Sequence, residues 1–272
     1  MKARRCRSQK VGKAYEAYSA GRQTLSDLSR RTGLSVRTLR RKFDAFSPPD
    51  VSQQAAPKPV ALILDATFFG RGCGLMIYRA ESANIHWQEI ESETLSVLEA
   101  GLRHLLTQGW IFSSVTIDGR KGAVSLIHRL LPDVPVQFCL FRQKAIVRRY
   151  LAGKPKTLCG QELHALTSFL GFVSEAIFMD CLDDLRDRYV NFLKERNDLG
   201  QFKHRRLGSA LPSLRANAPL LFAHQRFADQ AVPTTTNSCD GSFAHWKNKV
   251  KIHRGLKPKR RSKMIRFLLS KT

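Results

Sequence analysis

The pattern of apolar and polar positions predicts alternating strands and helices between residues 60 and 138. Short apolar runs of strand length are separated there by longer stretches with helical spacing. The five predicted strands are Val60–Leu64, Cys73–Tyr78, Asn84–Ile90, Val115–Ile117 and Val134–Phe138. The two predicted helices are Glu93–Gln108 and Ala123–Leu131. Three strands and a helix, followed by strand, helix and strand, predict an α/β fold with a mixed sheet.

Helical spacing dominates the chain after the last predicted strand. It extends from about Phe141 to Gln230, with its clearest periodic runs at Glu162–Met179 and Leu182–Lys194. The segment that begins at Cys239 also has helical spacing. We therefore expect a helical insertion at about 141–230, either within the sheet domain or as a subdomain on it.

A different pattern at Thr24–Phe43 predicts two short helices joined by a tight turn. Gly33 allows the left-handed backbone that such a turn needs, and Ser35 is placed to cap the second helix. The inward stripe of that second helix is Val36, Leu39 and Phe43. The spacing is typical of a helix-turn-helix.

The outward face of the second helix is rich in cations and suits a recognition helix in the major groove of double-stranded DNA. Its candidate DNA-binding residues are Arg37, Thr38, Arg40, Arg41 and Lys42. An ordinary helical hairpin with a solvated basic face is the alternative.

Composition favours nucleic acid as the partner. The 272 residues hold 46 Lys and Arg against 22 Asp and Glu, which gives a formal net charge of +24. The longest apolar runs are far shorter than the roughly 20 residues of a membrane span. No apolar signal segment follows Met1. We expect a cytoplasmic, DNA-associated protein with no membrane partner.

The domain boundaries follow from changes in composition. We predict a helix-turn-helix DNA-binding domain at 1–46, a linker rich in Pro, Ser, Gln and Ala at 47–59, and a sheet domain at 60–272. Residues 244–272 carry eleven Lys and Arg and no acid, which favours a phosphate-binding surface over a frayed basic tail.

Two aspartates close or interrupt predicted strands. Asp65 follows Val60–Leu64, and Asp118 follows Val115–Ile117. Neighbouring strands that bring both carboxylates to one sheet edge would make an oxygen-rich site for Mg²⁺ or Mn²⁺. The alternatives are structural, because Asp118 begins a common Asp-Gly turn. Asp65 could also pair with Arg71 or another cation.

A third carboxylate, Asp240, lies where a further helix is expected to begin. If Asn237 or Ser238 caps that helix, Asp240 lies in its first turn. Lys247 and Lys251 share its stripe and are candidate DNA contacts, while an adjoining apolar stripe would anchor the helix on the sheet. Aspartate is also a common helix-start residue with no further role. The adjoining stripe consists of Phe243, Trp246 and Val250.

Several short motifs, in this order, resemble bacterial insertion-sequence transposases of the mutator-like group. They are Leu62–Phe69 (LILDATFF), Val115–Arg120 (VTIDGR), Val136–Lys144 (VQFCLFRQK) and Thr235–Phe243 (TTNSCDGSF), with the basic segment up to Leu256. The resemblance spans about residues 60–260. It implies an RNase H-like fold with an acidic triad, in which Asp65 is the first-strand ligand and Asp118 the fourth-strand ligand.

The chain departs from the family pattern at two site positions. The third acid of the family is a Glu, which corresponds here to Asp240, and a family histidine corresponds to Arg142. Arg142 remains a candidate phosphate ligand.

The resemblance implies an Mg²⁺-dependent transposase that cleaves and joins DNA strands, as a homodimer on double-stranded DNA. The alternative is a catalytically impaired, transposase-derived DNA-binding protein or regulator. A structure-selective nuclease of the same fold is a third interpretation.

Overall fold

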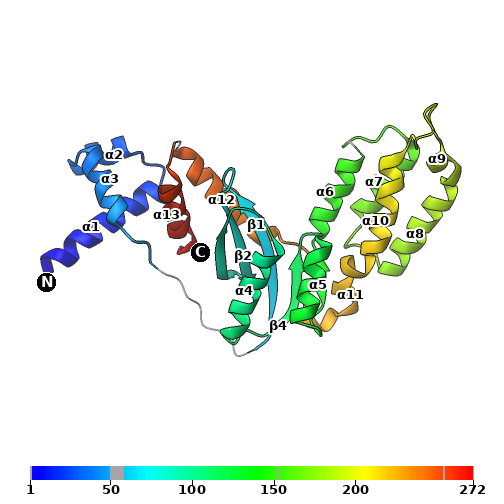
Figure 1. The fold of residues 1–272 in the computed structure, drawn as a ribbon, viewed down its shortest axis with the longest axis horizontal. Helices are drawn as coiled ribbons and strands as arrows, with labels where there is room; N and C mark the ends of the chain where they lie inside the picture. Colours follow the sequence, from blue (N-terminus) through cyan, green and yellow to red (C-terminus); the bar gives the residue numbers. More distant parts are fainter. Residues whose placement is uncertain (1, 50–57, 152, 254, 272) are drawn as a thin grey trace.

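The computed structural model describes residues 2–49, 58–151, 153–253 and 255–271. One five-stranded sheet lies at the centre, with helices on both faces and a larger helical group beyond one edge (Figure 1). The fold is therefore of the predicted α/β class with a mixed sheet.

All five predicted strands are present. They are β1 Val60–Phe68, β2 Gly74–Ala80, β3 Ala83–Ile90, β4 Phe112–Ile117 and β5 Val136–Phe138. Their order is β3-β2-β1-β4-β5, with β2 antiparallel to β1 and β3, and β4 parallel to β1 and β5. β1 is longer than predicted. Asp65 therefore lies inside the strand, paired with Ile77, rather than after its end.

Alternate residues of β1 pack into two different hydrophobic clusters, because successive side chains of a strand point to opposite faces. Leu62 and Leu64 join the cluster that contains the buried face of α4 (Leu95–Thr107). α5 (Lys121–Leu130) packs beside α4 in that cluster. Ile63 belongs to the second cluster, together with Trp246 and the helices at both ends of the chain.

The N-terminal segment forms three helices, α1 Lys2–Ser19, α2 Leu25–Thr32 and α3 Val36–Ala45. Thr24 and Asp27 form a capping box at α2, and Gly33 ends that helix with a φ of 71°. Ser35 accepts a hydrogen bond from the backbone N–H of Thr38, so the predicted cap of α3 is confirmed.

The N- and C-terminal helices share one hydrophobic cluster. Tyr15 of α1 packs edge-on against both Phe43 of α3 and Phe267 of α13 (Pro258–Leu269). α13 follows α12 (Asn237–Ile252), and Figure 1 shows both between the N-terminal helices and the sheet. In the predicted linker at 47–59, residues 50–57 lie outside the described residues.

The helical region is built from α6 to η1. Its elements are α6 Leu140–Tyr150, α7 Leu158–Ser168, α8 Glu175–Arg188, α9 Val190–Lys194, α10 Arg205–Leu221, α11 Ala223–Arg226 and the 3₁₀ helix η1 Ala228–Gln230. The run predicted at Glu162–Met179 is not one helix. Gly171 has a φ of 91°, and Ser174 caps α8, so the chain turns between α7 and α8. Among the described residues, no helix is both long and apolar enough to span a bilayer.

Candidate active site

Asp65 lies in the middle of the sheet, where its carboxylate is almost fully buried. Its side chain is 2% exposed, and one carboxylate oxygen accepts a hydrogen bond from the N–H of Ala66 at 2.8 Å. Burial raises the pKa of Asp65 to about 6, although Arg142 acts in the opposite direction. A buried carboxylate at this position needs a cation partner, which was the structural alternative stated for Asp65 at the level of sequence.

That partner is Arg142, in the first turn of α6. Its Nη2 lies 3.1 Å from Oδ2 of Asp65 and 3.2 Å from Oδ1 of Asp240. One guanidinium nitrogen therefore contacts two carboxylates from distant parts of the sequence. Asp65 therefore pairs with Arg142 and not with Arg71, the arginine named as its possible partner at the level of sequence. Arg142 itself, expected to contact phosphate, is engaged by two acids.

Asp240 reaches the site because the start of α12 is tied to the start of α6. Leu140 donates its N–H to the carbonyl of Thr234 at 3.0 Å, and the N–H of Thr236 lies 3.4 Å from Sγ of Cys139. Asp240 is in the first turn of α12, as predicted. The predicted cap is wrong, since α12 begins at Asn237 and the preceding Thr236 makes no side-chain cap.

The apolar stripe of α12 anchors the helix as predicted. Phe243 and Trp246 are buried and Val250 is partly buried, all in the cluster that includes Ile63 of the sheet. Lys247 and Lys251 are exposed on the stripe that begins at Asp240. Cations therefore follow the carboxylate along the open face of this helix.

Asp118 directly follows β4, which is parallel to β1. The last pair of these two strands is Ile63 with Thr116, so Asp65 and Asp118 each lie two residues beyond that pair. The charge of Asp118 contributes to the raised pKa of Glu93, after burial as the larger cause. Glu93 is itself paired with Arg120 at 3.2 Å.

Three aspartates act on the guanidinium of Arg142. Burial lowers the pKa of Arg142, but the charges of Asp65, Asp240 and Asp118 together outweigh burial, so its pKa lies above the ordinary value. Nε of Arg142 is buried without a hydrogen-bond partner among the described residues. Two acids, Asp65 and Asp240, thus contact this cation, whereas Asp118 acts on it through its charge.

The carboxylates of Asp65, Asp118 and Asp240 are chemically suited to a divalent metal ion. In the structure, the cation beside them is the guanidinium of Arg142. Carboxylate oxygens are the ligands that Mg²⁺ and Mn²⁺ prefer. The geometry is not that of a formed metal site, because the described residues include no group of three or more His, Cys, Asp or Glu arranged to hold a metal. Arg142 would have to withdraw before Asp65 and Asp240 could share a metal ion.

Two charged residues near the site were missed at the level of sequence. Glu93 precedes α4 and lies within range of Asp118. Arg79 is buried in β2, donates to Oδ1 of Asn84 at 3.0 Å, and bonds to Ser238 and Ser242 at the start of α12. The sequence pattern that could have identified Arg79 is a single arginine in an otherwise apolar strand. Its hydrogen bonds hold the start of α12, the helix that carries Asp240.

The candidate DNA-binding residues of α3 differ in exposure. Arg37, Arg40 and Arg41 are exposed, whereas Thr38 and Lys42 are half-buried. The hydroxyl of Thr38 lies 2.9 Å from that of Ser35, so it is already used at the helix cap. The three arginines are consequently the more accessible candidates.

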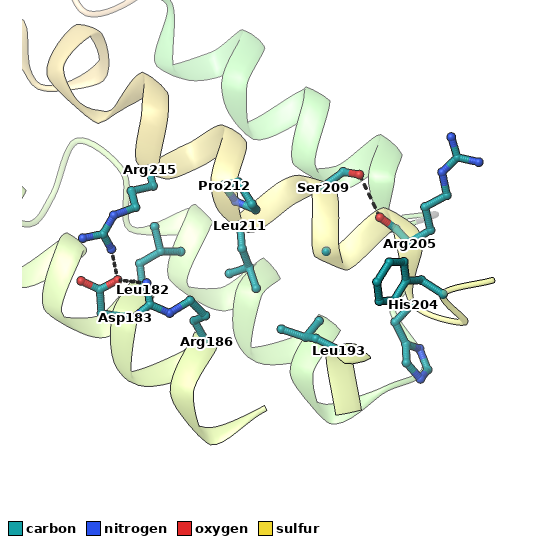
Figure 2. A pocket seen from close by; sticks show the side chains of 12 residues that line it. Leu182, Asp183, Arg186, Leu193, His204, Arg205, Ser209, Leu211, Pro212 and Arg215 are labelled. Atoms are coloured by element: carbon teal, nitrogen blue, oxygen red, sulfur yellow. Dashed lines mark hydrogen bonds and ion pairs between the residues drawn. The ribbon is translucent and has the colours of Figure 1, made fainter. Parts of the chain in front are cut away.

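A cavity of about 610 Å³ lies away from the carboxylates, between α8 and α10 (Figure 2). Its acidic lining residue, Asp183, is held by Arg215 and by Arg186, the latter at 3.3 Å. Leu182, Leu193 and Leu211 make much of the remaining wall. Among the described residues that line it, this apolar cavity has one carboxylate, which two arginines hold, so it offers fewer oxygen ligands than the site of Asp65, Asp118 and Asp240.

Comparison with known proteins identifies no relative, since no family model and no curated protein matches this chain. The site residues are therefore characterised by their own contacts. Those contacts join Asp65 and Asp240 through Arg142, with Asp118 close enough for its charge to act on the same group.

Proposed function

We propose that this chain is a DNA transposase with an RNase H-like catalytic domain and N-terminal helices that bind double-stranded DNA. One observation carries the proposal. Asp65 from β1 and Asp240 from α12 contact the same guanidinium, on which the charge of Asp118 also acts. Converging carboxylates of this kind suit phosphodiester cleavage and strand transfer.

The sheet topology supports the RNase H-like assignment. β1 and β4 are adjacent and parallel, although the antiparallel strands β2 and β3 separate them in the sequence. The ends of adjacent parallel strands lie at one edge of the sheet. The first-strand and fourth-strand acids of the resemblance lie on these two strands: Asp65 is within β1, two residues beyond its last pair with β4, and Asp118 directly follows β4.

Asp65, Asp118 and Asp240 would hold Mg²⁺ or Mn²⁺. When bound, such an ion would activate water or a 3′-hydroxyl and stabilise the departing oxygen. Arg142 pairs with two of these carboxylates, those of Asp65 and Asp240. A phosphate offers the planar guanidinium a similar pair of oxygens, so the bound DNA can draw Arg142 away from Asp65 and Asp240.

The N-terminal helices and α12 supply the DNA contacts. Base recognition is assigned to the exposed arginines of α3, and phosphate contact to Lys247 and Lys251. Because transposition holds two element ends together, the active form is a homodimer on DNA. The proposed location is the bacterial cytoplasm.

A second candidate function is a transposase-derived DNA-binding protein without cleavage activity. The same ion pairs favour it, because Arg142 already pairs with the carboxylates of both Asp65 and Asp240. The two candidates differ in whether Arg142 releases these acids when DNA binds.

Strand cleavage separates them. The substrate is duplex DNA containing the sequences that flank the gene, incubated with the full chain and Mg²⁺ or Mn²⁺. Wild-type protein should cut at the element ends, and Asp65→Ala should bind the DNA without cutting it. If both proteins bind and neither cuts, the DNA-binding alternative holds. Cleavage of branched DNA that lacks element ends would instead indicate a structure-selective nuclease.

A further inference from the structure

A basic surface lies at the opposite end of α6 from the carboxylates. It surrounds a cavity of about 410 Å³ where α6 ends and where α7 and α10 begin. The cavity lining includes no Asp or Glu among the described residues. We call this surface the helical basic patch and define it by Lys156, Lys203, Arg205 and Arg206, which line the cavity, and by Arg149, which precedes the lining residue Tyr150. All five are exposed.

The charges of the helical basic patch are largely uncompensated. Lys203 lies 3.7 Å from Glu195, but the described residues give Arg149, Lys156, Arg205 and Arg206 no ion pair. Figure 2 shows the side chain of Arg205 extending away from the helix. In the same view, Arg215 is joined to Asp183, so arginines of this region do pair where an acid is within reach.

Helix electrostatics explain only one of the arginines in the helical basic patch. Arg149 is in the last turn of α6, where the helix dipole favours a cation. Arg205 and Arg206 begin α10, where the dipole disfavours cations, and the preceding His204 provides no side-chain cap. Two arginines beside uncapped backbone N–H groups form a place that an anion would stabilise.

α6 connects the helical basic patch to the carboxylate site. Arg142 and Arg149 are seven residues apart and so lie on one stripe of the helix, about 10 Å apart along its axis. That spacing corresponds to about three base pairs, at 3.4 Å per step along one strand. A strand with one phosphate at Arg142 therefore has another phosphate within reach of Arg149.

We propose that the helical basic patch binds the phosphate backbone of the same DNA segment that enters the carboxylate site. The inference rests on the proposed function, because it assigns a second contact to that DNA. It gives the helical region a role that does not depend on base sequence, in contrast to the arginines of α3.

The salt dependence of DNA binding tests this inference. Fluorescence anisotropy titrations of a labelled duplex at several salt concentrations compare the full chain with Arg205→Ala/Arg206→Ala. Each lost phosphate contact should reduce the slope of log K against log [salt] by about 0.9. The matched control is Arg103→Ala/Arg129→Ala, whose arginines already pair with Glu99, and its slope should stay at the wild-type value.

The outcomes separate this inference from the proposed function. Wild-type binding with an unchanged slope in Arg205→Ala/Arg206→Ala overturns the helical basic patch and leaves the proposed function standing. Failure of the wild-type chain to bind any duplex overturns both. If the double variant does not fold, as judged by circular dichroism, Arg149→Gln gives the same comparison with one contact removed.

Discussion

The carboxylate site and the helical basic patch lie at the two ends of α6. They differ in whether their charges are paired within the protein. In the site, buried Asp65 and half-buried Asp240 share Arg142 at 3.1 and 3.2 Å. In the patch, Arg205 and Arg206 are exposed and have no ion pair within the described chain. Desolvation explains the difference, because a buried charge needs a partner in the protein, whereas an exposed charge is stabilised by water.

The two regions would respond differently to DNA. Binding at the helical basic patch releases counterions and leaves the fold unchanged. Binding at the site exchanges one partner of Arg142 for another, so it alters the charge around Asp65. The first region would supply affinity and the second would couple DNA binding to chemistry.

The largest expected effect is the loss of cleavage in Asp65→Asn. Removing a charge from the reacting centre should lower the cleavage rate by about 10³-fold or more, which is about 4 kcal/mol. Gel analysis of end cleavage measures it, with Asp133→Asn as a control for an exposed acid. Equal activity in Asp65→Asn and wild type would show that Asp65 has no role in the cleavage chemistry.

The pH dependence of stability should show the cost of burying Asp65. Its pKa is about 6 in the folded chain against 3.8 ordinarily, so the folded state holds the proton more tightly. The free energy of unfolding should therefore fall by about 3 kcal/mol as pH rises from about 4 through about 6. Urea denaturation across this range should show a smaller fall for Asp65→Asn. If the free energy of unfolding falls equally with pH in Asp65→Asn and in wild type, the raised pKa of Asp65 is contradicted.

Removing the central cation should destabilise the chain and free the acids. Arg142→Ala should lower the free energy of unfolding at neutral pH by about 2 kcal/mol, less than for fully buried pairs because the side chain is 36% exposed. It should also raise the affinity for Mn²⁺ without DNA about tenfold, since a like charge leaves the site. Calorimetry measures Mn²⁺ binding, with Arg142→Lys as the charge-preserving control. An unchanged Mn²⁺ affinity would show that Arg142 does not compete with metal.

The smallest effect concerns α3, whose exposed arginines resemble those of the helical basic patch. Ser35→Ala removes the hydrogen bond to the Thr38 N–H and should cost about 1 kcal/mol of stability. Thermal denaturation measures it, and Ser35→Asp, which can still cap the helix, should stay near wild type. If Ser35→Ala is as stable as wild type, the cap does not help to hold α3.

The sequence predicted the local elements well because local rules control them. Short apolar runs predicted all five strands, and Gly33 and Ser35 predicted the turn and cap before α3. It did not predict the turn between α7 and α8, because the apolar spacing continues across Gly171 while the backbone there does not.

The pairings around the site could not be predicted from local patterns. Arg142 was expected to contact phosphate, but it contacts Asp65 and Asp240, which come from β1 and α12. Arg79 was missed because its partners, Ser238 and Ser242, are distant in the sequence. Such contacts depend on how the sheet and α12 pack together.

The amino-acid sequence by itself determined the α/β class, the order of the elements, the strong positive charge and the identity of the three aspartates. The packing of distant segments was needed to show that Asp65 and Asp240 share one arginine, and that Arg205 and Arg206 have no acidic partner within the described residues. The physical reason is that element formation depends on neighbours in sequence, whereas charge compensation depends on burial and on which distant groups the fold brings together.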